Sequence, residues 1–147
     1  MRDFVGKVAV VTGAASGMGR AFAQRFAAEG MAVVLADVEQ EPLAEAVSQL
    51  RGQGYDVFGV ETDVSDRAAV QRLAQATLDR YGAVHLLVNN AGVEGYMDGP
   101  IWEATEKDWA WTMGVNFWGV VHGLQAFLPI MLRQGGEGHV VNTVSMT

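Results

Sequence analysis

The sequence predicts one α/β domain in which a parallel β-sheet is covered by helices on both faces. Short apolar runs rich in β-branched residues alternate with longer segments whose apolar residues recur at helical spacing. The apolar runs contain few polar residues, which suits strands buried on both sides. Many of the 18 glycines fall at the ends of these segments. A chain of 147 residues without a linker or internal repeat is expected to form a single domain.

The first strand, turn and helix form the most informative unit. Lys7–Val11 is predicted to be a buried strand, and Arg20–Glu29 a helix with Phe22 and Phe26 on one face. Thr12–Gly19 joins them as a glycine-rich turn. Glycines let a ligand approach the main chain, and a helix N-terminus favours an anion because its N–H groups are free. The unit therefore predicts a phosphate site.

The same alternation continues along the rest of the chain. Ser65 and Asp66 are both candidates for the N-cap of the third helix, and Gly82 is expected to end that helix. The expected elements are strand Met31–Ala36, helix Glu41–Leu50, strand Tyr55–Val60, a helix from Ser65 or Asp66 to Tyr81, strand Val84–Val88, a long helix from Thr105 to Arg133, and strand His139–Val144.

The long helix 105–133 carries two apolar stripes. One face is expected to pack on the sheet, and the other needs a cover. A second copy of the chain would provide that cover and make a homo-oligomer; the alternative is burial by other parts of the same fold. Pro129 is expected to free the carbonyl of Gln125 and bend the helix. The first stripe comprises Met113, Phe117, Val120, Val121, Leu124, Phe127 and Leu128, and the second Trp111, Val115, Trp118 and His122.

Composition narrows the function classes. The formal net charge of −7 argues against a nucleic-acid or anionic-membrane partner. The absence of cysteine excludes disulfides and thiolate metal sites and favours a reducing compartment, so we expect a cytoplasmic protein. His85, His122 and His139 lack the spacing of metal ligands, so no metal site is expected. We expect no signal peptide and no stretch approaching the ~18–20 apolar residues of a membrane-spanning helix.

Asp37 gives the phosphate site a more specific meaning. It ends the second strand roughly 20 residues after the glycine turn, where a carboxylate accepts hydrogen bonds from the adenosine ribose of a dinucleotide. A carboxylate there repels the 2′-phosphate of NADP, and the neighbouring positions hold Ser16 and Val38 rather than a cation. We therefore predict NAD as the cofactor. The alternative is an ordinary Asp at a strand end or helix cap.

Five segments resemble motifs of the classical short-chain dehydrogenase/reductase family, in the family's order. They are Thr12–Gly19 (TGxxxGxG), Asp63-Val64, Asn89–Gly92 (NNAG), Asn116, and Val140–Ser145. The resemblance covers essentially the whole chain. It implies a Rossmann-like doubly wound sheet with helices on both faces and strand order 3-2-1-4-5, the later strands being missing. Residues 1–147 would then be a dinucleotide-binding domain that is incomplete at its C-terminus.

The resemblance also implies a role for each matching residue. Ser145 would hydrogen-bond the substrate oxygen, and Asn116 would hold a helix distortion and a water in a proton relay. For Asn90 and Asn116 the alternative is a buried amide that satisfies main-chain groups. The implied cofactor contacts are Gly13, Ser16, Gly17, Met18 and Gly19 around the pyrophosphate and nearby ribose, Asp37 at the adenosine ribose, Asp63 and Val64 beside the adenine, and Asn90, Ala91 and Gly92 along the cleft.

One part of the family's pattern is absent from this sequence. The family's general acid/base is a Tyr followed four residues later by a Lys, downstream of the serine. The sequence stops at Thr147, and its tyrosines all precede Ser145. We therefore expect residues 1–147 alone to be inactive, and the apolar edge of the last strand to be left bare.

These expectations combine into one predicted function. In the complete polypeptide, an NAD-dependent oxidoreductase would interconvert a small-molecule secondary alcohol and a ketone by hydride transfer. The alternative is a non-catalytic NAD-binding module, or an inactive fragment that lacks the Tyr/Lys pair.

Overall fold

The centre of the protein is a five-stranded parallel sheet with the strand order β3-β2-β1-β4-β5, as expected from the sequence. The structure is a computed structural model that describes residues 1 and 3–145. Its strand bounds differ from the sequence expectations by one or two residues. The strands are β1 (Val8–Thr12), β2 (Ala32–Asp37), β3 (Val57–Glu61), β4 (Leu86–Asn89) and β5 (His139–Asn142).

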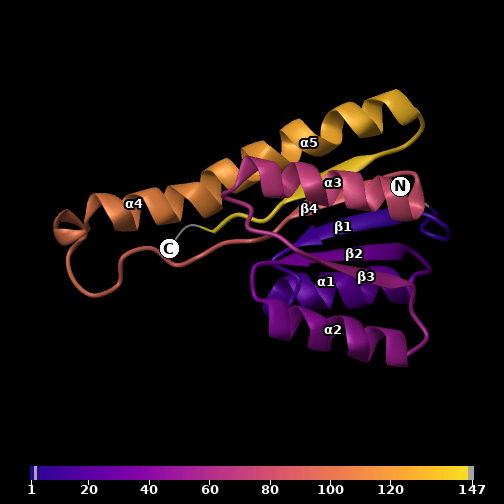
Figure 1. The fold of residues 1–147 in the computed structure, drawn as a ribbon, viewed down its shortest axis with the longest axis horizontal. Helices are drawn as coiled ribbons and strands as arrows, with labels where there is room; N and C mark the ends of the chain where they lie inside the picture. The colour runs from indigo at the N-terminus through magenta and orange to yellow at the C-terminus, as the bar shows by residue number, and fades with distance from the viewer. Residues whose placement is uncertain (2, 146–147) are drawn as a thin grey trace.

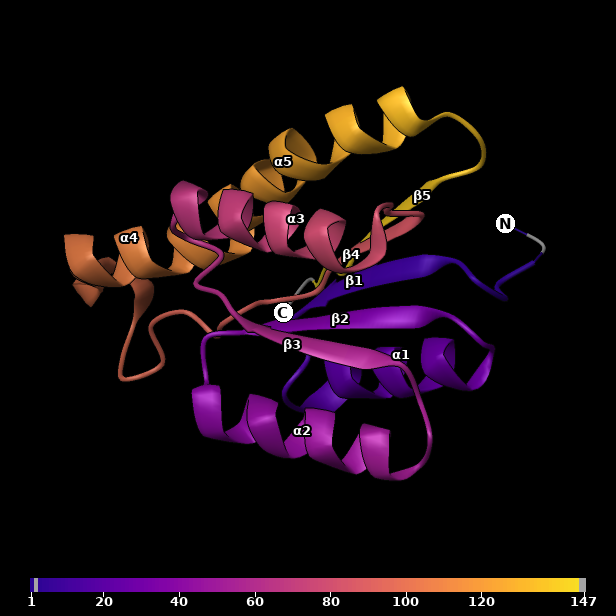
Figure 2. The same ribbon diagram turned by 45° about the vertical axis from the view of Figure 1, so that its right-hand side comes forward.

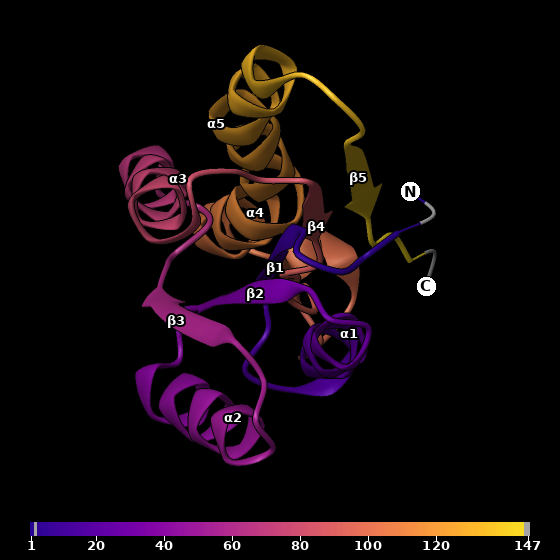
Figure 3. The same cartoon turned by 90° about the vertical axis from the view of Figure 1, so that its right-hand side faces the viewer.

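Helices cover both faces of the sheet (Figure 3). One face carries α1 (Gly17–Ala28) and α2 (Gln40–Gly52), and the other carries α3 (Arg67–Tyr81) and α5 (Gly119–Gln134). Alternate strand residues point to opposite faces. The core is therefore split into two clusters, with Val11 facing α1 and Val10 facing α3 and α5.

The central strands are buried because they have neighbours on both sides and helices on both faces. All of β1 is buried, with Val10 paired to Val34 on one side and to Leu87 on the other. The last strand, β5, lies at the edge of the sheet, and its residues are exposed except for the half-buried Val140. Among the described residues, this edge is as bare as the sequence suggested.

Local capping explains where two of the helices begin and where one of them ends. Asp66, rather than Ser65, caps α3, because its side chain accepts a hydrogen bond from the N–H of Ala68. Gly82 ends α3 in the left-handed conformation, at φ 74°. A further helix, α4 (Glu106–Met113), begins with a capping box between Thr105 and Asp108.

The expected helix 105–133 is continuous but not uniform. It consists of α4, a π-helical turn at Gly114–Trp118, and α5, in which Pro129 lies. Figure 1 shows α4 continuing the line of α5 beyond the sheet. The segment before it, which includes a 3₁₀ turn at Ile101–Glu103, loops out past the carboxyl ends of the strands (Figure 2).

The π turn changes which residues face the sheet. Phe127 is buried as part of the first expected stripe, but Met113 and Phe117 of that stripe are exposed. A π turn contains an extra residue, so an apolar pattern counted straight through it does not remain on one face. The buried face of α5 instead consists of four residues at helical spacing, Gly119, Gly123, Phe127 and Met131.

The continuous helix is more apolar than the sequence analysis allowed. Among the described residues, Glu106–Gln134 is the one helix long and apolar enough, by length and composition, to cross a bilayer; its 18-residue window has a mean hydropathy of 1.4 and is 22% buried. The expectation that no stretch approaches this composition was therefore wrong. One apolar face of this helix packs on the sheet through α5, where Phe127 is fully buried. Another apolar face lies on α4 and is exposed.

Candidate active site

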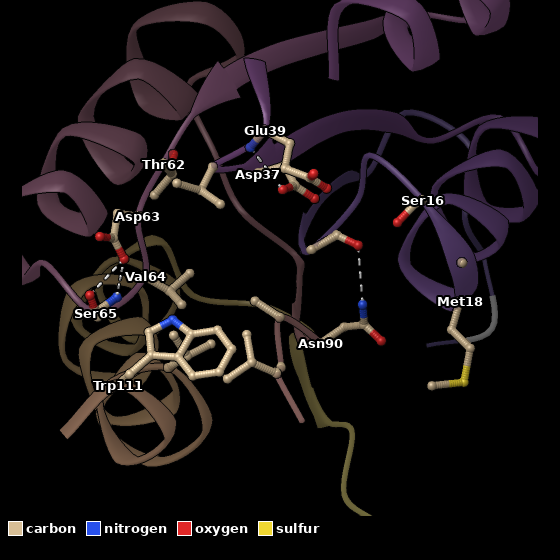
Figure 4. Close-up of a pocket in the computed structure, with 17 residues that line it drawn as sticks. Ser16, Met18, Asp37, Glu39, Thr62, Asp63, Val64, Ser65, Asn90 and Trp111 are labelled. Atoms are coloured by element: carbon tan, nitrogen blue, oxygen red, sulfur yellow. Dashed lines mark hydrogen bonds between the residues drawn. The ribbon is translucent and has the colours of Figure 1, made fainter. Parts of the chain in front are cut away.

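A cleft of about 610 Å³ opens at the carboxyl ends of the strands (Figure 4). Ligands in open parallel α/β sheets bind at this edge, where the strand order reverses. The reversal here is between β1, which pairs with β2, and β4 on its other side. The cleft is lined by Gly13, Ser16, Gly17, Met18, Asp37, Val38, Glu39, Thr62, Asp63, Val64, Ser65, Asn90, Ala91, Gly92, Val93, Trp111 and Val115.

The glycine turn leaves room for a ligand at the start of α1. Gly13 and Gly17 have φ values of 64° and 52°, a region that favours glycine. A side chain at Gly13 would lie 2.8 Å from the Cα of Ala91, whereas one at Gly17 would meet nothing within 4 Å. Because α1 begins at Gly17, the first N–H groups of the helix lack intrahelical partners and border this open space. The turn can therefore accept a phosphate.

Gly19 has a different role from the other glycines of the turn. It is buried and does not line the cleft. A Cβ at this position would overlap the carbonyl oxygen of Gly13 and lie 2.6 Å from Asn90 Nδ2. Gly19 therefore lets α1 pack closely against the turn and against the end of β4.

Thr12 connects the turn to the end of β4 and was missed by the sequence analysis. Its hydroxyl oxygen accepts hydrogen bonds from the N–H groups of Asn90 and Ala91, each at 3.0 Å. The side chain of Asn90 in turn donates to the carbonyls of Thr12 and Gly13, at 3.1 and 3.3 Å. The NNAG segment and the glycine turn are thus held together as one unit. The amide of Asn90 satisfies main-chain groups, which was the structural alternative for this residue.

Asp37 lines the cleft and also holds the glycine turn in place through hydrogen bonds. Its Oδ2 accepts a hydrogen bond from the N–H of Ala15 at 2.9 Å, and its Oδ1 accepts one from the N–H of Glu39 at 3.1 Å. A carboxylate has about four lone-pair sites, so each oxygen keeps acceptor capacity. Asp37 can therefore bind hydroxyl groups in the cleft without releasing the turn.

The Asp63–Ser65 segment forms the wall opposite the glycine turn. Asp63 Oδ1 accepts hydrogen bonds from the N–H and the hydroxyl of Ser65, at 2.9 and 2.7 Å. The carbonyl of Val64 accepts a hydrogen bond from Nδ1 of His122, at 2.9 Å. A Cβ on Gly119 would lie 2.8 Å from Val64 Cγ2, so the glycine allows the helix to approach this closely. His122 is thus a structural residue that positions Val64.

Asn116 lies in the π-helical turn, where the resemblance placed a helix distortion. Its Oδ1 accepts a hydrogen bond from the N–H of Val93 at 2.8 Å, and its Nδ2 donates to the carbonyl of Val93 at 2.9 Å. The side chain therefore fixes the segment that follows the NNAG motif. Asn116 itself does not line the cleft.

The end of β5 is hydrogen-bonded to the NNAG segment. Asn89 Nδ2 donates to Asn142 Oδ1 at 2.9 Å, and the Thr143 hydroxyl donates to Asn90 Oδ1 at 3.1 Å. A Cβ on Gly123 would overlap Asn89 Oδ1, so this helix glycine leaves room for the network. Ser145 follows two residues after Thr143 and is exposed. It does not line the cleft formed by the described residues.

The structure gathers most of the predicted cofactor residues in one cleft. Of the predicted residues, Gly19, Asn116 and Ser145 lie outside its lining. The lining residues that sequence reasoning missed are Val38, Glu39, Thr62, Ser65, Val93, Trp111 and Val115. Most of them adjoin a predicted residue in the sequence. Trp111 has no such signal, because only the fold brings α4 to the cleft.

The charge of the cleft is negative at the end of β2. Carboxylates of Asp37, Glu39 and Asp63 line it, and within the described residues no lysine or arginine does. Such a lining repels an additional phosphate group beside Asp37. No group of three potential metal ligands occurs among the residues that the structure describes.

Comparison with known proteins identifies the family. The sequence profile described as short chain dehydrogenase matches residues 7–147. The chain is 42% identical to 1-deoxy-11-beta-hydroxypentalenate dehydrogenase from Streptomyces avermitilis over 139 residues, which cover 95% of this chain and 52% of that protein. It is 40% identical to C alpha-dehydrogenase from a Sphingobium species over 147 residues, 99% of this chain and 48% of that protein.

A solved structure agrees with the sequence relatives. The crystal structure of a short chain dehydrogenase/reductase from Burkholderia phymatum in complex with NAD matches with a TM-score of 0.95 at 55% identity, covering 99% of this chain and 51% of that one. The chain spans about half the length of the curated relatives it matches. With the profile match extending over nearly all of its residues, the chain belongs to the short-chain dehydrogenase/reductase family.

Proposed function

We propose that this chain is the cofactor-binding part of an NAD-dependent oxidoreductase that interconverts a secondary alcohol and a ketone by hydride transfer. The observation that carries the proposal is the position of Asp37 and the open glycine turn in one cleft. The turn offers free N–H groups to a pyrophosphate. The oxygens of Asp37 offer acceptors to the two hydroxyls of an adenosine ribose. A 2′-phosphate would meet Asp37 and Glu39 instead, which favours NAD over NADP.

The other predicted residues have definite places in this proposal. Gly13, Ser16, Gly17 and Met18 surround the pyrophosphate and the nearby ribose, while Gly19 shapes the turn from behind. Asp63 and Val64 flank the adenine. Asn90, Ala91 and Gly92 line the part of the cleft where the nicotinamide end would lie. The network through Thr12 keeps these segments in register before the cofactor binds.

The proposed chemical step uses groups from residues 1–147 together with groups that these residues do not contain. NAD, when bound, supplies the acceptor for the hydride. We propose that the hydroxyl of Ser145 donates a hydrogen bond to the substrate oxygen, and that the main chain near Asn116 holds a water that passes on the proton. The side-chain amide of Asn116 is occupied by Val93, so its contribution is to hold the π turn in place. The Tyr/Lys pair is expected downstream of Thr147.

The domain assignment follows from the same reasoning. We propose that residues 1–147 form a dinucleotide-binding domain that further strands extend on the β5 side, where the sheet edge is exposed. The exposed apolar residues where α4 meets the π turn, Met113 and Phe117, support a homo-oligomer built on this helix. The lack of cysteine supports a cytoplasmic setting.

The rival function is a non-catalytic NAD-binding module. Reading the coding sequence past Thr147 separates the two, because a Tyr-x-x-x-Lys shortly downstream supports the enzyme and a stop codon supports the module. The polypeptide that contains this chain should then form NADH from NAD with members of a panel of secondary alcohols. A Ser145→Ala variant should keep NAD affinity and lose most of the turnover. Turnover that is unchanged in Ser145→Ala would contradict the proposed role of this serine.

A further inference from the structure

Trp111 is an aromatic side chain in the cleft that none of the family motifs contains. It belongs to α4, and its side chain is 53% exposed. In Figure 4 the indole points into the cleft beside Val64, across from Asp37 and Glu39. A large apolar ring with half of its surface open is available to a ligand.

The position of this indole is set by contacts between the helix and the Asp63–Ser65 segment. A Cβ on Gly114, one helical turn after Trp111, would lie 3.3 Å from Ser65 Cβ. The carbonyl of Val64 accepts a hydrogen bond from His122, and its side chain packs against Gly119. The helix is thus anchored to the segment on both sides of the π turn. Trp111 is held at the rim of the cleft although its ring is not buried.

The chemistry of this end of the cleft suits a flat heteroaromatic ring. Val64, Val115 and Trp111 provide apolar surface, while Thr62 and Asp63 provide polar groups at its border. The acceptors for ribose hydroxyls lie at Asp37, and the phosphate-binding turn lies beyond them. A dinucleotide whose pyrophosphate occupies the turn and whose ribose meets Asp37 has its base at this end.

We propose that Trp111 stacks on the adenine of the bound dinucleotide and forms the outer wall of the adenine subsite. The proposal rests on the proposed function. Base–aromatic stacking contributes enough that losing the ring typically weakens binding by about tenfold or more. The indole would cover the base on the side that faces solvent and so slow its release.

The test compares Trp111→Leu with Trp109→Leu in the polypeptide that contains this chain. Trp109 is the matched control because it is on the same helix and 50% exposed, and it is not among the described residues that line the cleft. Calorimetry would measure the dissociation constants of NAD, of AMP as the adenine probe, and of nicotinamide mononucleotide. Circular dichroism would check that each variant is folded.

We expect Trp111→Leu to raise the dissociation constants of NAD and AMP by about tenfold and to leave that of nicotinamide mononucleotide unchanged. Trp111→Phe should restore most of the affinity, and Trp109→Leu should behave like the wild type. An unchanged AMP constant in folded Trp111→Leu, or an equal loss in Trp109→Leu, would overturn the proposal. If the wild type binds neither NAD nor AMP, the proposed function fails together with it.

A fluorescence experiment reports on the ring itself. A variant with Trp102, Trp109 and Trp118 replaced by Phe retains Trp111 as its fluorophore within residues 1–147. Any downstream tryptophan would be replaced in the same way. Stacking of adenine on the indole should quench this emission as AMP is added, with a midpoint equal to the calorimetric dissociation constant. Emission that stays constant while AMP binds would show that the base does not reach Trp111.

Discussion

Replacing Thr12 with Val would remove the hydroxyl that joins the glycine turn to the NNAG segment. Thr12 is buried, and Val has nearly the same shape, so the change removes hydrogen bonds without creating a large cavity. The N–H groups of Asn90 and Ala91 both lose their acceptor. A buried donor left without a partner costs about 1–3 kcal/mol, so two such donors cost about 2–6 kcal/mol before relaxation. Partial exposure of Asn90 and local adjustment place the expected destabilisation at about 3 kcal/mol.

The assay is urea unfolding of the polypeptide that contains this chain, followed by fluorescence and circular dichroism. Thr12→Val should lower the midpoint without changing the slope, since the exposed surface on unfolding is the same. Thr12→Ser is the control because it keeps the hydroxyl and loses one methyl group, which costs about 1 kcal/mol. A Thr12→Val protein within about 0.5 kcal/mol of the wild type, or one that is no more destabilised than Thr12→Ser, would refute the reasoning.

Substitutions at Asp37, Gly19 and His85 test three other contacts. Asp37→Arg should shift the ratio of kcat/KM values from NAD toward NADP by about tenfold or more, and Asp37→Asn should weaken NAD without favouring NADP; an unchanged ratio in Asp37→Arg would count against the ribose contact. Gly19→Ala should destabilise the fold by about 1–3 kcal/mol in urea, because its Cβ overlaps a carbonyl of the turn, whereas Gly52→Ala, in open space, should not. Burial and a nearby lysine lower the pKa of His85, whose Nδ1 accepts a hydrogen bond from the N–H of Val8 at 3.0 Å. Its contribution to stability is present above the ordinary pKa of 6.5 and is lost as pH falls through that value toward the folded pKa. The difference in unfolding free energy between pH 7.5 and 5.5 should therefore be smaller in His85→Gln, and an equal difference in both proteins would contradict this.

Features that depend on local sequence could be predicted well. The apolar runs identified the strands, and the first strand and glycine turn located the start of α1 within three residues. The place of Asp37 beside the glycine turn could be predicted from its spacing, because the end of β2 must lie beside the end of β1 in a parallel sheet. The need for glycine at positions 13 and 17 could also be predicted, because a turn with positive φ values admits few other residues.

Features that depend on contacts between distant segments could not be predicted. The hydrogen bonds that Thr12 accepts from Asn90 and Ala91 join residues far apart in the chain, and an isolated Thr at a strand end gives no sign of them. The π turn shifts the register of the long helix by a residue, so its apolar periodicity misplaced the exposed face. Trp111 lines the cleft only in the folded protein, where its helix packs against the Asp63–Ser65 segment through Gly114 and Gly119.

The central claim is that the cleft at the ends of β1, β2 and β4 binds NAD. Isothermal titration calorimetry of the polypeptide that contains this chain, with NAD and NADP titrated separately, tests it most directly. The account predicts saturable binding of NAD and at least about tenfold weaker binding of NADP, because the 2′-phosphate meets the carboxylates of Asp37 and Glu39. Binding of neither dinucleotide, or equal affinity for both, would contradict it.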